Sequence, residues 1–366
     1  GKIDEKIYQY DVASLYPSVM KNNVYPVHLL EYDITDRVTD GFPSINPSHS
    51  TAEVFINSPS DTFPVRVKQG VLYMNGRGWV TLAGPELYYA KQMGYIEKTR
   101  SWATYECAEL FNSYVDYFWD MKISAEREDD YVQRTFAKLM LNSLYGKFGQ
   151  MGSSLVPVTD YMPIDEFGLC TVSHALTGKI TRYVSFFDVV LREEKGKELQ
   201  FSVPAISAFV TSYARQTMRK LKTIVGAENY YYMSTDCLIV NANGRIHLQN
   251  AKEINPGVLG KLNLEAKGDD GWIGGLHFYR IGSKSIEGSK KASAETIDQF
   301  TWREPHFDSL KSVIQQGGKP EINITKMVKR RSLEYRKGCV LENGKIEPFR
   351  LDSIDSIKAY SISTMV

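Results

Sequence analysis

The order of apolar and polar positions divides the chain into extended and helical stretches. Residues 4–13 alternate well enough for a strand, which is expected to break at "SLYPS" because Pro17 disfavours helical backbone in the residue before it. Residues 26–85 are rich in Pro, Asn, Ser, Asp and Gly, and we expect short strands and turns there. Three helical segments follow up to residue 149: "PELYYAKQMG", "ECAELFNSYVDYFWDMKISAERE" and "DYVQRTFAKLMLNSLYGKFG".

The second half of the chain begins with a return to extended structure. Short strands and turns are expected over residues 150–200, and residues 207–226 have the spacing of an amphipathic helix that ends at Gly226. In "YYYMSTDCLIV", residues 230–240, two apolar runs meet at Ser-Thr-Asp. Aromatic and β-branched residues on both sides predict a tight hairpin that carries Asp236 at its turn. The segment after it predicts strands joined by Gly-rich turns.

Composition restricts the class of protein. The 366 residues suffice for two or three domains, and a net charge of +1 means that any nucleic-acid site is local rather than a general basic field. The four cysteines include no C-x-x-C pair, so neither a zinc site nor a disulfide framework is expected. No apolar run reaches the roughly 18 residues of a membrane span. We therefore expect a soluble, intracellular protein without a membrane partner.

The helix predicted around residues 131–149 presents one polar face. Lys138, Asn142, Tyr145 and Gly149 recur at i, i+4, i+7 and i+11, with Arg134 one turn earlier. An apolar stripe beside this face would bury the helix. Cations suit a triphosphate, while an amide and a phenol suit a nucleobase. An ordinary solvated polar face is the alternative.

Two aspartates, Asp11 and Asp236, each stand in an apolar strand context 225 residues apart. Such a placement is costly unless the charge is paired or bound to metal. Two carboxylates on neighbouring strands form an oxygen-ligand site suited to Mg²⁺. The backbone N–H groups of the "VASL" that follows Asp11 could turn towards phosphate oxygens. For either aspartate alone, a structural hydrogen bond remains an equal alternative.

These segments together resemble a known family. "DVASLYPS", "KLMLNSLYGKFG" and "YMSTDCL" occur in the order and spacing of the three polymerase motifs of family B DNA polymerases. The middle motif is most similar to that of the protein-primed phage and plasmid branch, and the resemblance extends to about residue 290. It implies an α+β, right-hand polymerase fold with an antiparallel-sheet palm, helical fingers and a small thumb.

The resemblance also implies a division of the chain. Residues 1–25 and 201–290 would form the palm, and residues 86–149 a helical segment that includes the fingers. Residues 26–85 and 150–200 would be insertions that ring the template and aid strand displacement, or family decoration without function. Residues 291–366 would form the thumb, where the basic run "KMVKRRSLEYRKG" could grip the duplex backbone.

Site residues follow from the motif positions. Asp11 and Asp236 would be catalytic, binding two Mg²⁺ ions with the Val12 carbonyl, with Mn²⁺ as a substitute for Mg²⁺. Tyr16 would exclude a 2′-hydroxyl. The implied nucleotide-binding residues are Ala13, Ser14, Leu15, Tyr16, Lys122, Arg134, Lys138, Asn142 and Tyr145. The implied DNA-binding residues are Gly146, Lys284, Lys329, Arg330 and Arg331.

The sequence departs from the family pattern at two positions. Ser234 stands where the third motif usually has a first aspartate, and loss of that charge is expected to weaken Mg²⁺ binding. Ile286 replaces the tyrosine of a Lys-x-Tyr element that contacts the primer terminus. Both departures concern catalytic strength more than the fold.

The function implied is template-directed addition of deoxynucleotides to a primer 3′ end. Two alternatives remain: a degenerate polymerase that binds DNA or a partner, and a primase or untemplated nucleotidyl transferase. Expected partners are primer–template DNA and dNTPs, with a priming (terminal) protein or a separate exonuclease chain left open. Because only ten residues precede Asp11, no proofreading exonuclease is expected in this chain. The expected location is the cytoplasm, of a bacterial host if a phage or mobile element encodes the protein.

Overall fold

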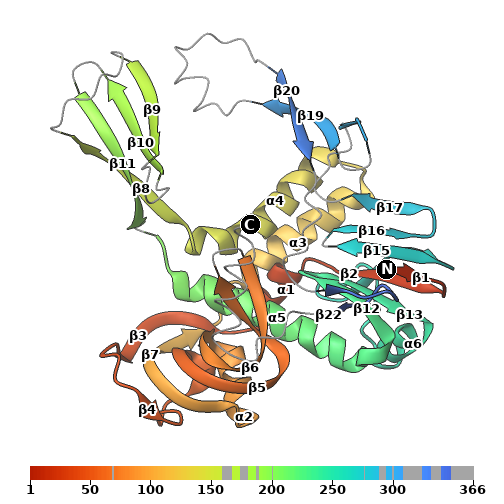
Figure 1. Cartoon of the computed structure of the whole chain (residues 1–366), viewed down its shortest axis with the longest axis horizontal. Helices are drawn as coiled ribbons and strands as arrows, with labels where there is room; N and C mark the ends of the chain where they lie inside the picture. Colours follow the sequence, from red (N-terminus) through yellow and green to blue (C-terminus); the bar gives the residue numbers. More distant parts are fainter. Residues whose placement is uncertain are drawn as a thin grey trace. The chain divides into compact units, whose positions relative to one another are not determined.

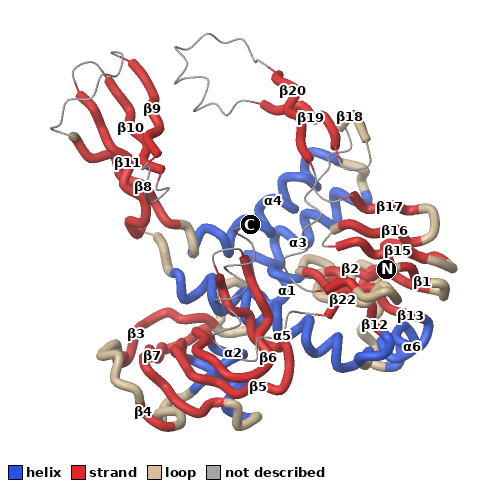
Figure 2. The backbone as a smooth tube through the Cα atoms, in the orientation of Figure 1, coloured by secondary structure: helices blue, strands red, loops and turns tan. Residues whose placement is uncertain are grey.

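A computed structural model describes residues 1–67, 70–158, 167–173, 180–186, 189–199, 201–275, 277–287, 294–298, 301–307, 324–330 and 339–347. The chain divides into two units (Figure 1). The first comprises Gly1–Gly149, Val203–Gly288 and Leu333–Val366, and the second comprises Gln150–Ser202 and Ser289–Ser332. Figure 2 shows that the described helices all belong to the first unit, together with several of the sheets.

An antiparallel sheet at the centre of the first unit pairs a strand from the start of the chain with strands from residues 230–268. Its strand order is β12 (Tyr230–Ser234), β13 (Cys237–Asn241), β2 (Ile7–Val12) and β14 (Leu262–Gly268). The hairpin predicted from "YYYMSTDCLIV" is confirmed as β12–β13. Every residue of β2 is buried except Asp11, which is intermediate. A strand covered on both faces therefore holds one partly accessible carboxylate.

A second antiparallel sheet covers one face of the first. Its order is β1 (Lys2–Ile3), β15 (Gly271–Gly275), β16 (Phe278–Ile281) and β17 (Lys284–Glu287), as the Gly-rich turns of this segment predict. Apolar side chains from the two sheets share one buried cluster, which includes Tyr232. Burying this apolar area stabilises the end of β2, where Asp11 lies.

Helices cover the other face. The helix α5 (Pro204–Val225) buries an apolar stripe on β2 and β13 and ends at Gly226, whose φ of +86° suits glycine, as predicted. Before it in the chain, β2 ends at Val12, so the strand breaks where expected. The reason given for the break is wrong, because Tyr16, which precedes Pro17, lies in a helix, α1 (Leu15–Lys21). Pro17 lies in the first turn of α1, where a helix has no partner for the backbone N–H anyway. The pattern also missed α6 (Ala242–Asn250).

Two packed helices, α3 (Asn112–Arg127) and α4 (Tyr131–Phe148), confirm the end of the predicted helical region (Figure 1). Asp130 caps α4 by accepting a hydrogen bond from the Gln133 N–H at 2.9 Å. The helical prediction is right for α2 (Gly84–Gln92) but wrong for residues 106–108, which belong to the strand β7 (Ile96–Ala108). Its partners lie far away in sequence, so the local pattern could not reveal the pairing.

Residues 25–108 build a sheet of their own around β7. The order is β3 (Tyr25–Asp33), β7, β5 (Ser50–Val67) and β6 (Gly70–Ala83); β4 (Thr39–Asp40) also pairs with β7, and a short 3-10 helix, η1 (Pro47–His49), precedes β5. The prediction of short strands here is therefore wrong, since β5 and β6 form one long hairpin with a register shift between Ser58 and Phe63. Such an irregularity lets polar and small residues stand within a long strand.

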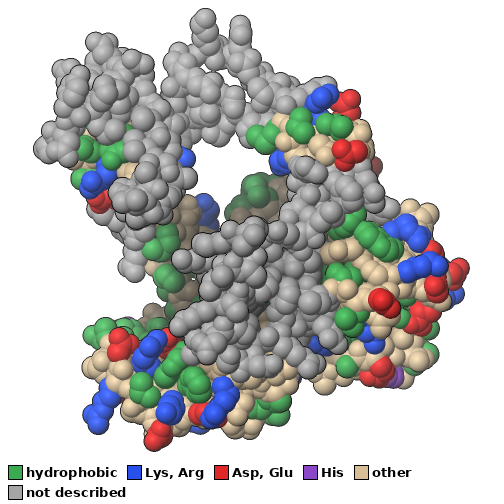
Figure 3. All heavy atoms as spheres, viewed as in Figure 1, with side chains coloured by type: hydrophobic (Ala, Val, Ile, Leu, Met, Phe, Trp, Pro, Cys, Tyr) green, Lys and Arg blue, Asp and Glu red, His purple; other side chains and the backbone are tan. Residues whose placement is uncertain are grey.

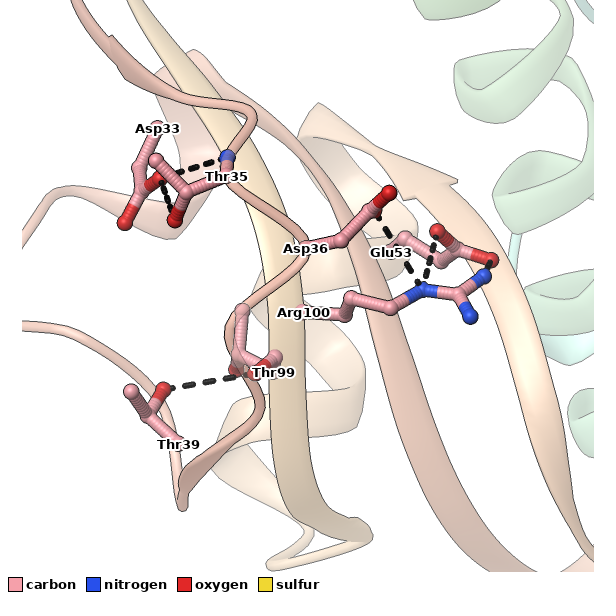
Figure 4. A network of polar contacts seen from close by, with 7 residues as sticks. All are labelled: Asp33, Thr35, Asp36, Thr39, Glu53, Thr99 and Arg100. Carbon is pink, nitrogen blue, oxygen red and sulfur yellow. Dashed lines mark hydrogen bonds and ion pairs between the residues drawn. The ribbon is translucent and has the colours of Figure 1, made fainter.

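Polar contacts tie the loop after β3 to this sheet (Figure 4). The guanidinium of Arg100 on β7 donates from Nε to Glu53 on β5 at 2.9 Å and lies 3.8 Å from the Asp36 carboxylate. The Thr39 hydroxyl donates to the Thr99 carbonyl at 3.3 Å. Figure 3 shows Lys and Arg side chains interspersed with Asp and Glu over this sheet, which is the surface of a solvated domain rather than a basic groove.

The helix α2 (Gly84–Gln92) follows β6 in the chain and packs against α5. Glu86, whose side chain is 1% exposed, accepts hydrogen bonds from Arg215 on α5 at 2.7 and 2.6 Å. The Ser212 hydroxyl donates to the Ala83 carbonyl at 2.7 Å. A Cβ at Gly84 would lie 2.7 Å from the Phe209 ring, so only glycine permits this approach. Buried polar contacts therefore fix the inserted sheet onto α5.

We expect Arg215→Met to destabilise the chain by about 3–5 kcal/mol, because it leaves the Glu86 carboxylate buried without its cation. Urea denaturation measures the change in the free energy of unfolding. The control is Arg77→Met, which removes the exposed partner of Glu97 and is expected to change stability by about 1 kcal/mol or less. Equal losses in the two variants would contradict the role given to the buried pair.

The second unit contains two described sheets. One has the order β8 (Met151–Pro157), β11 (Val189–Glu198), β10 (Ile180–Phe186) and β9 (Phe167–Ser173), as the extended pattern of residues 150–200 predicts. The other pairs β18 (Glu295–Thr296), β19 (Thr301–Phe307) and β20 (Ile324–Arg330).

Part of the predicted thumb belongs to the first unit instead. The hairpin β21 (Cys339–Val340) and β22 (Ile346–Glu347) lies beside β1, where the Lys2 N–H donates to the Glu342 carbonyl at 3.2 Å. Of the described residues in this stretch, 339–347 therefore belong to the first unit, whereas 294–298, 301–307 and 324–330 belong to the second. The assignment of residues 291–366 to a thumb stays a prediction.

Candidate active site

The sheet register brings the two aspartates together. Asp11 on β2 pairs with Cys237 on one side and with Asn263 on β14 on the other. Asp236 occupies the β12–β13 turn next to Cys237, and its carbonyl accepts a hydrogen bond from the Val12 N–H at 2.9 Å. Residues 225 positions apart in sequence therefore meet at one sheet edge, as predicted.

A pocket of about 210 Å³ opens at this edge. It lies between the sheet, the start of α1 and the polar faces of α3 and α4. The residues that line it are Asp11, Val12, Ala13, Ser14, Leu15, Tyr16, Lys122, Lys138, Asn142, Asp236, Asn263 and Glu265. All but the last two were singled out from the sequence; Asn263 and Glu265 were missed, although both lie within the segment after the hairpin that was expected to form strands.

Burial dominates the electrostatics of the aspartates. It raises the pKa of the Asp11 carboxyl, and the charges of Asp236 and Glu265 raise that pKa further. Burial also raises the pKa of Asp236, against which the charges of His277 and Lys138 act. Oδ1 of Asp11 is buried and has no hydrogen-bond partner among the described residues. An orphaned buried carboxylate oxygen beside a second carboxylate fits a bound cation.

The side chains at this site do not, however, form a closed set of metal ligands. Within the described part of the chain, no three His, Cys, Asp or Glu side chains gather closely enough to enclose a metal ion. Mg²⁺ does not require such a cage, because it keeps several waters and uses one or two carboxylates with substrate phosphates. Asp11, Asp236 and the Val12 carbonyl suit that mode of binding.

Two residues close in sequence to the aspartates have left-handed backbone. Ser14, which precedes α1, has a φ of 49°, and Thr235, in the hairpin turn beside Asp236, has a φ of 51°. Residues other than glycine rarely adopt this conformation, and where they do the surrounding structure imposes it, commonly at functional sites. Ser14 lies three residues after Asp11, and Thr235 directly precedes Asp236.

An aromatic pair connects the first and second motifs. The rings of Tyr16 and Tyr145 have centroids 4.3 Å apart and an interplanar angle of 31°. Burial raises the pKa of Tyr16 to about 12, helped by Tyr145. Tyr145 itself does not line the described pocket; it supports Tyr16 from α4. The ring of Tyr16 is therefore held in place at the pocket wall.

The three predicted triphosphate cations differ in their surroundings. Lys138 is exposed at the pocket, whereas Lys122 lies with its ammonium 4.5 Å from the Trp119 ring centre and 3.8 Å from Glu126. Burial lowers the pKa of Lys122. Arg134 donates from Nε to Glu126 at 3.1 Å and does not line the pocket. Glu126 on α3, which was not singled out from the sequence, thus holds the side chain of Arg134 from α4.

The remaining site predictions vary in outcome. The Ala13 N–H donates to the Lys261 carbonyl at 2.8 Å, so it is not free to meet a phosphate. A Cβ built at Gly146 would meet nothing within 4 Å, which leaves open space there. The Lys284 ammonium donates to the Glu265 carbonyl at 3.0 Å.

Three of the basic residues predicted to bind DNA, Lys329, Arg330 and Arg331, belong to the second unit. Lys329 forms an ion pair with Glu304, whose side chain is 3% exposed, so its charge is already matched. The backbone of Arg330 lies in β20, and Arg331 lies outside the described residues. Their roles in DNA binding stay predictions.

We expect Asp11→Asn to raise the melting temperature of the metal-free chain by a few degrees. The pKa of Asp11 is raised on folding, so at neutral pH its charge destabilises the folded state relative to the unfolded state. That penalty disappears as the pH falls through the raised pKa, and the variant should then lose its advantage. Thermal melts in EDTA at pH 7 and at pH 4 measure both effects; an unchanged difference between the two pH values would contradict this account.

Comparison with known proteins identifies the family. The family described as DNA polymerase type B, organellar and viral, matches residues 1–224, which contain the first two motifs. The chain belongs to this family. Membership confirms the resemblance read from the three motifs to family B DNA polymerases of the phage and plasmid branch.

This chain has relatives in a phage and in fungi. It is 26% identical over 330 residues to the DNA-directed DNA polymerase of Enterobacteria phage PRD1, covering 87% of this chain and 55% of that protein. It is also 26% identical over 294 residues to a probable DNA polymerase of Podospora anserina, covering 72% of this chain and 23% of that protein. The chain thus spans about half, or less, of the length of these relatives.

Solved structures of phi29 DNA polymerase share the fold. The complex with primer–template DNA and incoming nucleotide has a TM-score of 0.51 at 17% identity, covering 90% of this chain and 51% of that one. The complex with single-stranded DNA also has a TM-score of 0.51, at 15% identity, with 90% and 50% covered. The predicted α+β right-hand polymerase fold is confirmed. Among the described helices, none is long and apolar enough to cross a membrane.

Proposed function

We propose that this chain catalyses template-directed addition of deoxynucleotides to a primer 3′ end. The observation that carries the proposal is the pocket itself, which gathers Asp11, Asp236, Tyr16, Lys138 and Asn142 from three separate segments of the sequence. These are the residue types that nucleotidyl transfer needs: carboxylates for metal, a cation for phosphate and an aromatic ring at the sugar. Membership in the type B polymerases supports the same conclusion.

In this proposal Asp11 and Asp236 hold two divalent ions, normally Mg²⁺, together with the Val12 carbonyl. When bound, the ions would activate the primer 3′-hydroxyl and neutralise the leaving pyrophosphate. The strand pairing around β2 fixes Asp11, and the hydrogen bond between Val12 and the Asp236 carbonyl fixes the hairpin turn. The carboxylates are thus oriented before substrate arrives, which lowers the cost of reorganisation.

The helix α4 would bind the incoming nucleotide. Lys138 lines the pocket, where its charge acts on Asp236, and would meet the triphosphate together with Lys122. Arg134 would join them only after exchanging Glu126 for a phosphate oxygen, because its guanidinium donates to Glu126 in the free protein. Asn142 would contact the nascent base pair, Tyr145 would support Tyr16 beneath the sugar, and Gly146 would leave space for a base.

Primer extension tests this proposal against its alternatives. The natural chain is incubated with Mg²⁺ or Mn²⁺, dNTPs and a labelled primer, alone or annealed to templates of different sequence. Extension that follows the template supports the proposal. Addition to the primer without template would indicate a nucleotidyl transferase, and synthesis without any primer would indicate a primase. DNA binding without extension in either metal would indicate a degenerate polymerase.

A further inference from the structure

One acid, Glu126 on α3, contacts two of the cations that the proposed function assigns to the triphosphate. The Arg134 guanidinium, from α4, donates from Nε to Oε1 of Glu126 at 3.1 Å. The Lys122 ammonium, one turn earlier on α3, lies 3.8 Å from the same oxygen. The chain itself therefore supplies an anion to cations on two neighbouring helices.

The cations lie close enough to one another to interact. Burial lowers the pKa of the Lys122 ammonium, the charge of Glu126 opposes that effect, and the charges of Arg134 and Lys138 lower the pKa further. Like charges that act on one another in this way repel. Glu126 therefore offsets the repulsion within a cluster of three positive side chains.

The contact between Glu126 and Arg134 lies where a chain of phosphates would leave the pocket. Lys122 and Lys138 line the pocket, whereas Arg134 does not. Arg134 precedes Lys138 by four residues, which is one turn or about 6 Å along α4. A single phosphate at Lys138 does not span that distance, but a polyphosphate does. A polyphosphate that extends along α4 therefore meets Glu126 as well as Arg134.

This ion pair is also open to exchange. The side chains of Arg134 and Glu126 are 46% and 37% exposed, and ion pairs that water reaches contribute little to stability. A carboxylate carries one negative charge and a polyphosphate carries several, so the polyphosphate attracts the cations more strongly. The displaced carboxylate remains nearby and repels the bound anion.

We propose that Glu126 is an internal competitor of the nucleotide's phosphates: it pairs with Arg134 and Lys122 until a polyphosphate displaces it, and so limits how tightly polyphosphate binds. This rests on the phosphate site of the proposed function. Glu126 acts through the two cations, so it is a positioning residue rather than a catalytic one. It keeps the cation cluster balanced before the nucleotide binds and again after pyrophosphate leaves.

The test measures binding of inorganic tripolyphosphate to the full chain by isothermal titration calorimetry, in EDTA and without DNA. Glu126→Gln keeps the size of the side chain and removes its charge; it is expected to tighten binding by about 3–10-fold. The matched control is Glu128→Gln, which removes the same charge from an exposed side chain with which no described residue forms an ion pair. This control should change binding by about 2-fold or less.

A double-mutant cycle shows whether Glu126 acts through Arg134. Arg134→Gln alone should weaken tripolyphosphate binding, and adding Glu126→Gln to it should restore much less than the gain seen in the natural chain. An equal gain in both backgrounds, or equal gains from Glu126→Gln and Glu128→Gln, would mean that any lost negative charge strengthens binding. Either result would overturn the proposal.

Lys138→Gln distinguishes failure of this proposal from failure of the phosphate site. If Lys138→Gln loses tripolyphosphate binding while Glu126→Gln binds as the natural chain does, the inference about Glu126 is wrong and the site stands. If neither the natural chain nor Glu126→Gln binds tripolyphosphate, both are wrong.

Primer extension separates competition from a structural role of the ion pair. If Glu126 competes with phosphates, Glu126→Gln should lower the KM for a deoxynucleoside triphosphate by about 3–10-fold, the factor by which tripolyphosphate binding tightens, without raising kcat. If the ion pair instead holds α3 and α4 in place, the variant should raise KM and lower kcat, and this result would overturn the proposal.

Discussion

Replacing Asp11 or Asp236 with asparagine is expected to reduce primer extension by about 10³-fold. Asparagine preserves the shape of each side chain but removes the charge that would bind metal. Both positions lie at the edge where β2, β13 and the hairpin turn meet, and Asp11 has an oxygen with no described partner. Loss of charge there removes stabilisation of the transition state rather than of the fold.

The measurement is single-nucleotide extension of a labelled primer–template, with binding of the same DNA followed by fluorescence anisotropy. Binding should persist in both variants, because the carboxylates contribute no attraction to phosphate. Asp33→Asn is the control: its carboxylate accepts hydrogen bonds only within the turn at Thr35 of the inserted sheet, and activity should not change. Appreciable extension by either site variant at ordinary Mg²⁺ would refute the assignment of that aspartate.

Replacing Tyr16 with alanine is expected to reduce discrimination against ribonucleotides by about 10–100-fold. The ring lines the pocket beside the backbone of residues 13–15 and stacks on Tyr145. Removing it would open space at the place where a 2′-hydroxyl would otherwise collide. Discrimination is measured as the ratio of kcat/KM for a deoxyribonucleotide to that for the matching ribonucleotide on one primer–template.

Tyr16→Phe is the matched control, since it keeps the ring and removes only the hydroxyl. It should retain the discrimination of the natural chain if the bulk of the ring excludes the sugar hydroxyl. A loss in Tyr16→Phe equal to that in Tyr16→Ala would assign the effect to the phenol instead. Unchanged selectivity in both variants would mean that Tyr16 does not lie beneath the sugar.

Local pattern was enough where an element carries its own signals. The helix α4 has a capping aspartate, a continuous apolar stripe and a glycine stop, and α5 likewise ends at Gly226. The β12–β13 hairpin follows from two apolar runs around a short polar tip. Nine of the residues that line the pocket lie in the three motifs, because the motifs hold most of the functional side chains. Their individual roles remain predictions that the variants above test.

Local pattern failed where the partner of a segment is distant in sequence. The strand β7 reads as part of a helical region but pairs with β3 and β5, and tertiary pairing overrides a weak helical preference. The helix α1 contains Pro17 in its first turn, where backbone N–H groups have no acceptor within the helix and proline loses no hydrogen bond. In both cases the sequence prior was reasonable and the surrounding structure decided otherwise.

The amino-acid sequence by itself determined the chemical groups of this chain: which acids, cations and aromatic rings are present and which helix face carries them. Only the tertiary structure decided how they combine. The register of β2 between β13 and β14 brings Asp11 to Asp236 across 225 residues, and the bulge at Glu265 adds a charge that no motif predicts. Glu126 draws Arg134 away from the pocket. Charges interact through space over a few ångströms, so their partners are set by the fold and not by their separation along the chain.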